Sequence, residues 1–225
     1  MNNMKKYMLL GIPLILFGPK VLHYLGSDSL ILTMQAVLNL AIIMTCLIVL
    51  LRHTTLRNIF DWIIGICFSV YLCLLYKKTL EISLFYSHFQ YTVEDIKRVL
   101  THSVNIVPIK GIMDVLQYNP SALYQIFGNG IMLTPLAFAM LYFNWVKSIK
   151  QAIWYSFLCT VGIELIQFLQ SCAQVLFGIG QGRSTDIDDV ILNTMGAVLG
   201  TGCYLLWSKI ENRFNKKTKR TDVVM

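Results

Sequence analysis

The sequence predicts an all-α fold, a polytopic transmembrane helical bundle of about six spans. Two observations lead to this prediction. Hydrophobic residues make up 56% of the 225-residue chain and charged residues only 14%, whereas a soluble domain carries roughly 25% charged residues. The apolar residues are also gathered in six runs, and about 20 residues of helix suffice to cross the ~30 Å hydrocarbon core of a bilayer.

The first three runs predict an N-terminal three-span membrane region, which with the start of the following loop occupies residues 1–100. They cover residues 7–25, 30–51 and 59–76. The first run follows Lys5 and Lys6, as the apolar core of a signal peptide would. No small-residue cleavage motif follows it, so we expect it to be retained as a helix.

Residues 79–120 predict a long amphipathic loop between the third and fourth spans. Acidic and basic residues are mixed here, and no apolar run of 18 residues fits. Such a composition favours short helices that lie outside the membrane or on its surface. The sequence leaves these two placements open.

The last three runs predict a second three-span region over residues 101–207, followed by a basic cytoplasmic tail at 208–225. They cover residues 125–143, 153–177 and 187–207. The fourth run is interrupted by two glycines, Asn129 and Pro135. Transmembrane helices tolerate such interruptions where neighbours satisfy the freed backbone groups.

The basic residues predict the orientation. Twelve of the 19 Lys and Arg residues would lie on the side of the two termini, so the positive-inside rule places both termini in the cytoplasm. Lys77 and Lys78 are exceptions, because this orientation puts them outside. The formal charge of +7 is concentrated beside apolar runs and in the tail, which favours contacts with membrane lipids over nucleic acid.

The cysteines and histidines predict no metal site, no cofactor and no disulfide framework. The six cysteines lie in or beside apolar runs, and neither they nor the four histidines have the spacing of metal ligands.

The fifth run carries a polar face at helical spacing. Glu164, Gln167, Ser171 and Gln174 are separated by three or four residues and would share one side of a helix. A charge in the middle of a span costs on the order of 2.5–3.5 kcal/mol. Glu164 is therefore expected to be neutral, paired or facing a wet cavity.

The sixth run begins with the sequence G-R-S-T-D-I-D-D-V-I-L-N, residues 182–193. On a helix starting near residue 184, Asp186, Asp189 and Asn193 would share a face, and Asp188 would point elsewhere. A tight loop makes the fifth and sixth spans neighbours, with Arg183 between them. The sequence therefore predicts one polar cluster near the outer membrane face, formed by Glu164, Gln167, Arg183, Asp186, Asp189 and Asn193.

Three interpretations of this cluster remain open. It can be a ligand-binding or catalytic site, because ionisable residues inside a membrane are functional candidates by default. It can instead join helices, with Arg183 neutralising the acids. The D-x-D-D sequence at 186–189 also invites a divalent-metal or diphosphate interpretation, which is weaker because only two of the three aspartates would share a face.

Small residues and prolines complete the pattern. Gly196 and Gly200 have the spacing that lets a neighbouring helix approach closely. Asn105 and Pro108 in the loop, and Asn129 and Pro135 in the fourth run, are expected to serve packing, kinks and hydrogen bonding across helix interfaces.

The ordered set of these motifs resembles the VanZ-like membrane proteins. It consists of N-x-x-P at 105–108, Asn129 with Pro135, E-x-x-Q at 164–167, and G-R-x-x-D-I-D-D-V-x-L-N-x-x-G-x-x-x-G from Gly182 to Gly200. The resemblance covers roughly residues 100–207. It implies a multi-pass protein of the bacterial cell membrane. The family's named member gives low-level resistance to the lipoglycopeptide teicoplanin, with little effect on vancomycin.

The leading hypothesis is a protein of the cell envelope whose polar cluster binds a lipid headgroup, a cell-wall precursor or a lipoglycopeptide. An alternative is a membrane enzyme that modifies a lipid or polyprenyl-linked wall precursor, since paired carboxylates can act as general acid and base. No nucleophile motif supports that alternative. A transporter is a third possibility, although no inverted repeat is evident.

Overall fold

The structure, a computed structural model, is a bundle of long helices, and it confirms the predicted fold class. It describes residues 4–27, 29–84, 92–94, 97, 104–119, 123–177 and 184–221. Within these ranges, six helical segments are long and apolar enough to cross a membrane: Lys5–Leu25, Leu30–Arg52, Ile59–Thr79, Leu123–Tyr142, Ile149–Leu176 and Ile187–Arg213. The chain is therefore a multi-pass membrane protein.

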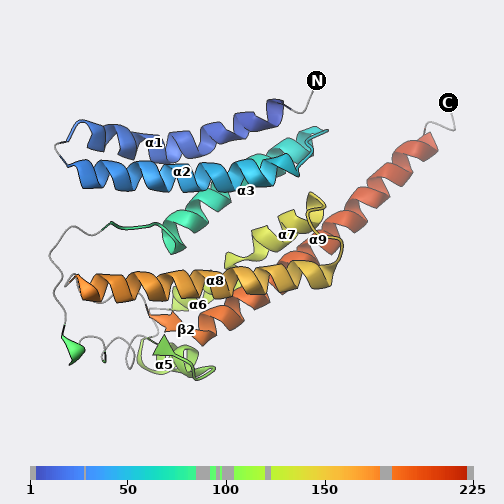
Figure 1. Cartoon of the computed structure of the whole chain (residues 1–225). Helices are drawn as coiled ribbons and strands as arrows, with labels where there is room; N and C mark the ends of the chain where they lie inside the picture. The colour runs from blue at the N-terminus through green and yellow to red at the C-terminus, as the bar shows by residue number, and fades with distance from the viewer. Residues whose placement is uncertain are drawn as a thin grey trace.

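The N-terminal region consists of a short 3-10 helix η1 (Lys5–Leu10) that runs into α1 (Gly11–Leu25), followed by α2 (Leu30–Arg52) and α3 (Ile59–Thr79). Figure 1 shows α1 and α2 lying side by side. Two caps explain the starts of the later helices. The Ser29 side chain accepts from the Leu32 N–H, and Asn58 and Asp61 form a capping box.

Both termini lie at one end of the bundle (Figure 1), which we call the terminal end; the opposite end is the distal end. The terminal end holds an apolar core that includes Leu9, Leu47, Phe68 and Phe143. These residues come from η1, α2, α3 and the segment after the fourth span. The core therefore joins the N-terminal helices to the C-terminal part of the chain.

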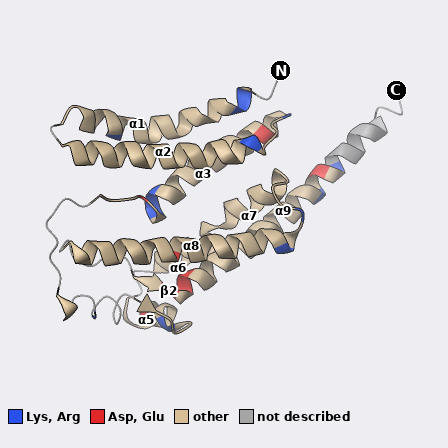
Figure 2. Ribbon diagram, in the orientation of Figure 1, with Lys and Arg blue, Asp and Glu red and all other residues tan. Residues whose placement is uncertain are grey.

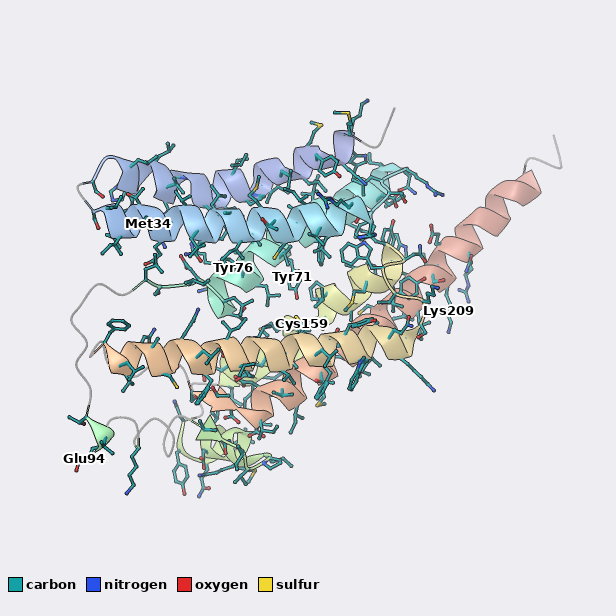
Figure 3. The ribbon with its side chains drawn as sticks, in the orientation of Figure 1. Met34, Tyr71, Tyr76, Glu94, Cys159 and Lys209 are labelled. Atoms are coloured by element: carbon teal, nitrogen blue, oxygen red, sulfur yellow. The ribbon has the colours of Figure 1, made fainter. Side chains whose placement is uncertain are left out.

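Helix α3 connects the two parts of the bundle through two tyrosines. Tyr71 and Tyr76, labelled in Figure 3, lie on α3 between the α1–α2 pair and α8. The Tyr71 hydroxyl donates to the Met132 carbonyl at 2.8 Å, and the Tyr76 hydroxyl donates to Oδ1 of Asn39 in α2 at 2.5 Å. Both tyrosine hydroxyls thus have a partner across a helix interface.

The fourth span is two helices rather than one, α6 (Leu123–Met132) and α7 (Thr134–Tyr142). The break at Leu133 follows from Pro135, because proline lacks the N–H that would continue the helical ladder. The Met132 carbonyl at the break accepts from Tyr71, and the Thr134 hydroxyl donates to the Gly196 carbonyl at 2.8 Å. Neighbouring spans therefore satisfy this interruption.

The fifth and sixth spans are α8 (Ile149–Leu176) and α9 (Ile187–Thr221). Helix α9 is longer than the predicted run at 187–207. It continues into the charged residues that the sequence suggested as a separate tail from 208. Lys and Arg on its last turns are helix formers, so the helix extends beyond the apolar stretch.

The two glycines of α9 lie where other backbone comes close. A Cβ on Gly196 would be 2.8 Å from the Gly130 carbonyl oxygen of α6, and one on Gly200 would meet the Thr134 carbonyl oxygen of α7. This is the small-residue packing that membrane helices use for close approach.

The distal end carries the short elements of the long loop. Strand β1 (Val104–Asn105) pairs in parallel with β2 (Thr185–Asp186), and α5 (Lys110–Tyr118) lies beside the start of α9. Figure 2 shows acidic residues at the start of α9, whereas much of the length of α1 and α2 is uncharged. The described elements of the loop, β1 and α5, therefore pack against the start of the sixth span.

Candidate functional site

Asp186 is the point where the family-type motifs meet. Its Oδ1 accepts from the Asn105 amide at 2.8 Å and from the Asp188 N–H at 2.9 Å. Its own N–H donates to Glu164 Oε2 at 3.1 Å. One aspartate thus joins β1, the first turn of α9 and the middle of α8.

Burial raises the pKa of Asp186 above its ordinary value, and the neighbouring carboxylates of Asp188 and Asp114 act in the same direction. The hydrogen bonds from Asp188 and Asn105 oppose this rise, because they favour the ionised form. Losing the hydrogen bond from Asn105 or from Asp188 would therefore raise the pKa of Asp186 further.

The N-x-x-P motif is a compact pair of turns. Asn105 Oδ1 accepts from the Val107 N–H at 3.2 Å, which is an Asx turn. The Lys110 N–H then donates to the Val107 carbonyl at 3.4 Å, with Pro108 and Ile109 in the middle of this turn. Ile109 has φ 69° and ψ −9°, the conformation of the third residue of a type II turn, where proline commonly precedes.

Asp188 corrects the prediction that this residue points away from the others. Its side chain is 2% exposed. Oδ1 accepts from the Ile109 N–H at 2.5 Å, and Oδ2 accepts from the Ile112 N–H at 3.1 Å. Asp188 therefore caps the N-terminus of α5 from another helix, where free N–H groups favour a carboxylate.

The reason for this error is the position at which α9 begins. The helix starts at Ile187, not near residue 184, and Asp186 is extended in β2. The assumed helical face through Asp186, Asp189 and Asn193 therefore does not exist as one surface. The first turns of α9 instead contact α5 through Asp188, α6 through Asp189 and α8 through Asn193.

Gly111 was missed by the sequence reasoning. A Cβ at this position would be 2.5 Å from Asp186 Oδ2 and 3.1 Å from Asp188 Oδ2. The start of α5 can approach both carboxylates only because residue 111 has no side chain. A glycine in the first turn of an amphipathic helix, shortly after the N-x-x-P motif, was the available signal.

Asp189 and Asn193 face two different neighbours. The Asn129 amide of α6 donates to Asp189 Oδ1, which is the cross-interface bond expected of an asparagine in an apolar run. The Asn193 amide donates to Thr160 Oγ1 of α8 at 3.0 Å, and Asn193 is 1% exposed. These two bonds fix α9 against α6 and α8.

Glu164 lies at the centre of α8 and is 5% exposed. Besides accepting from the Asp186 N–H, it makes a further interaction within the protein. It is twelve residues from the end of α8, or roughly 18 Å at 1.5 Å per residue. The structure thus places a buried carboxyl group deep within a membrane span.

Gln167 does not join the aspartates, contrary to the prediction of one cluster. Its amide donates to the Thr79 carbonyl at the end of α3, at 3.1 Å. The polar face of α8 is therefore divided. Glu164 accepts from the backbone of β2, whereas Gln167 and Gln170 donate to the carbonyls of Thr79 and Glu81. Arg183 and Gly182 lie outside the described residues.

The comparison with protein families identifies the family of this chain. The family model described as VanZ/LLP1 matches residues 68–208, more than half of the 225 residues. The chain belongs to the VanZ/LLP1 family. No curated protein and no solved structure matches the chain.

The VanZ/LLP1 match reaches further towards the N-terminus than the resemblance over residues 100–207. It begins at residue 68, within α3, although the first three runs show no family motif. This half of α3 carries Tyr71 and Thr79, which hydrogen-bond to α6 and α8. The matched region is thus the part of the VanZ-like protein that surrounds the motif residues.

The VanZ-like motifs are, in this geometry, a set of connections between segments. Asn105 meets Asp186, Asn129 meets Asp189, and Glu164 meets the backbone of β2. Each pair joins residues from different elements. The arrangement holds the described part of the loop, α6, α8 and α9 together around the half-buried Asp186.

Replacing Ile109 with glycine is expected to stabilise this VanZ-like protein. A β-branched residue at φ 69° is strained, and such positions cost of order 1–3 kcal/mol. The side chain is 57% exposed, so its removal loses little packing. The apparent Tm in detergent should rise for Ile109→Gly and should not rise for Ile109→Val, which keeps the branched Cβ. Equal Tm values for the three proteins would contradict the strain.

Proposed function

We propose that this VanZ-like protein acts at the outer leaflet of a bacterial cell membrane and lowers susceptibility to teicoplanin-type glycopeptides. Both termini are then cytoplasmic and the distal end faces outward. The observation that carries the proposal is the buried Glu164 carboxyl group in the middle of α8. A carboxyl group at that depth is expensive, and motif residues of this resistance-associated family surround it.

We propose that an ion pair between Glu164 and Arg183 forms the ligand-binding part of the site. Arg183 lies three residues before Asp186 in the sequence, and the Asp186 N–H donates to Glu164. A guanidinium offers five donors in a planar fork and binds carboxylates and phosphates in two-point contacts. Asp186, Asp189 and Asn193 would hold the surrounding segments in place.

The ligand of this site would be a polar part of an envelope molecule. A lipid headgroup, a wall precursor and the antibiotic itself each carry phosphate, carboxylate or amide groups that such a pair can bind. The α6 surface beside the site exposes Tyr124, Phe127 and Ile131, so acyl chains would lie against apolar side chains while the headgroup reaches the polar residues.

The test is growth inhibition by teicoplanin and by vancomycin in a susceptible Gram-positive host that expresses the protein. The wild type should protect selectively against teicoplanin, and Arg183→Ala and Glu164→Gln should each lose that protection at equal membrane levels. Two matched variants at the terminal end, Lys150→Ala and Glu211→Gln, change exposed charges and should protect like the wild type.

Two results would count against the proposal. Well-expressed wild type that gives no protection would remove the resistance function. Full protection by Arg183→Ala would remove the site while leaving the resistance function in place.

A further inference from the structure

Residues 81–84, which follow α3, form an extended segment between α2 and α8, within the membrane-spanning part of the protein. Asn39 Oδ1 and Nδ2 bond to the Ile82 N–H and carbonyl, both at 2.8 Å, and Gln35 Oε1 accepts from the Leu84 N–H at 3.0 Å. Asn39 is the tenth residue of the 23-residue helix α2. Non-helical backbone at such depth occurs where it is buried in protein or lines a polar cavity.

The other side of this segment lines such a cavity. A pocket of about 130 Å³ lies between residues 77–83 and the second half of α8. Its lining is almost entirely polar: Lys77, Lys78, Thr79, Glu81, Ser83, Gln167, Gln170, Ser171 and Gln174. Gln167 and Gln174 are a little under two helical turns apart, so the pocket follows α8 for roughly 10 Å.

The ionisable groups give this pocket an excess of positive charge. Glu81 is already paired, because its Oε1 lies 2.5 Å from Lys20 Nζ. The pocket also receives the two lysines of the last turn of α3, Lys77 and Lys78. The lining thus contains two lysines and one carboxylate, and that carboxylate is already paired with Lys20 from outside the lining.

The carbonyl groups at the end of α3 do not cancel this charge. The Leu75 carbonyl accepts from Thr79 Oγ1 at 2.7 Å, and the Tyr76 carbonyl accepts from the Leu80 N–H at 2.9 Å. The Thr79 carbonyl accepts from Gln167. These three carbonyl groups are therefore already occupied, and the lining adds lysine ammonium and glutamine amide donors.

Two of these donors have no hydrogen-bond partner among the described residues, the Lys77 ammonium and the Gln174 amide. Lys77 is exposed and Gln174 is half-buried. An ammonium group and an amide on opposite walls of a small pocket match the oxygens of a tetrahedral anion.

We propose that this pocket binds the phosphate of an anionic lipid headgroup or of a free phosphate compound. The lysines of the pocket are the residues that oppose the predicted orientation of the protein, since that orientation places Lys77 and Lys78 in the outer half of the bundle, where the positive-inside rule disfavours them. A phosphate ligand provides the compensating charge there. This inference does not depend on the resistance function, because it uses neither Arg183 nor an antibiotic.

The experiment is isothermal titration calorimetry of the full-length protein in a nonionic detergent. The probes are dihexanoyl phosphatidic acid, inorganic phosphate and dihexanoylglycerol, which has the same acyl chains without the phosphate. Lys77→Gln should weaken phosphatidic acid binding about fivefold, and Lys77→Gln with Lys78→Gln more than tenfold, at ~1 kcal/mol per lysine. Lys147→Gln with Lys150→Gln, at the terminal end, should leave the affinity unchanged.

The outcomes separate the two ligand sources. Binding of phosphatidic acid that inorganic phosphate does not displace supports a lipid headgroup, and tight binding of inorganic phosphate itself supports a free phosphate compound. The proposal is overturned if neither probe binds, if dihexanoylglycerol binds as tightly as phosphatidic acid, or if the double lysine variant, folded by its Tm, keeps the wild-type affinity.

Discussion

Replacing Asp188 with alanine is expected to destabilise the protein by about 2–5 kcal/mol. The substitution removes both acceptors for the part-buried N–H groups of Ile109 and Ile112, and a donor left without a partner costs roughly 1–3 kcal/mol. Residue 188 is 2% exposed, so water does not readily replace the carboxylate. The measurement is the free energy of unfolding in mixed detergent and dodecyl sulfate micelles.

Two variants serve as controls for this prediction. Asp188→Asn keeps one acceptor oxygen but turns an NH₂ group towards a backbone donor, so we expect an intermediate loss. Asp114→Ala removes an exposed carboxylate from α5 and should change the stability by less than about 0.5 kcal/mol. Wild-type stability for Asp188→Ala, combined with lost protection against teicoplanin, would reassign Asp188 from a cap of α5 to a residue of the functional site.

The second large effect is expected at Gly200, where α9 crosses α7. A methyl group in Gly200→Ala would meet the Thr134 carbonyl oxygen and lie 3.1 Å from the Ala137 Cβ. Backbone atoms cannot rotate away as a side chain can, so the helices must separate. We expect a loss of about 1–3 kcal/mol, the usual cost of overpacking, and a lower Tm.

Gly202 provides the matched control, because a Cβ there would meet no atom within 4 Å. Alanine is a better helix former than glycine by up to about 1 kcal/mol. Gly202→Ala should therefore be neutral or slightly stabilising, so the two variants differ in sign. Similar effects of Gly200→Ala and Gly202→Ala would show that the close crossing of α7 and α9 does not hold.

The two predictions have different consequences for function. Asp188 holds α5 and the turn at Pro108 against the start of α9, whereas Gly200 sets the distance between two spans. Asp186 and Glu164 are connected directly to the first of these contacts through the backbone of β2. Damage at Asp188 should therefore disturb the site more than equal destabilisation at Gly200, which growth tests at equal membrane levels can compare.

Much of the fold could be predicted because lipid imposes a simple rule on sequence. A span must be helical and mostly apolar, so six apolar runs gave six spans. The points at which helices break or end were harder to predict from the apolar runs. Pro135 breaks the fourth span because it cannot donate to the helical ladder, and α9 outlasts its apolar stretch because charged residues outside the lipid can still be helical.

The site was predicted only in part. Glu164, Asp186 and Asn105 stood out as polar residues in unusual places, and the structure brings these three together. Asp188 and Gln167 were wrongly placed, since helical spacing says which residues share a side but not which neighbour covers that side. Gly111 was missed because its role appears only when two carboxylates lie beside it.

The sequence by itself determined that this is a helical membrane protein, about where its spans lie, and that its motifs are VanZ-like. These properties depend on local composition and on the order of residues along one chain. The tertiary structure alone decided that Asn105 meets Asp186, that Asp188 caps α5, and that the polar face of α8 is divided between two sites. Such contacts join residues about 80 positions apart, and their geometry follows from how the helices pack.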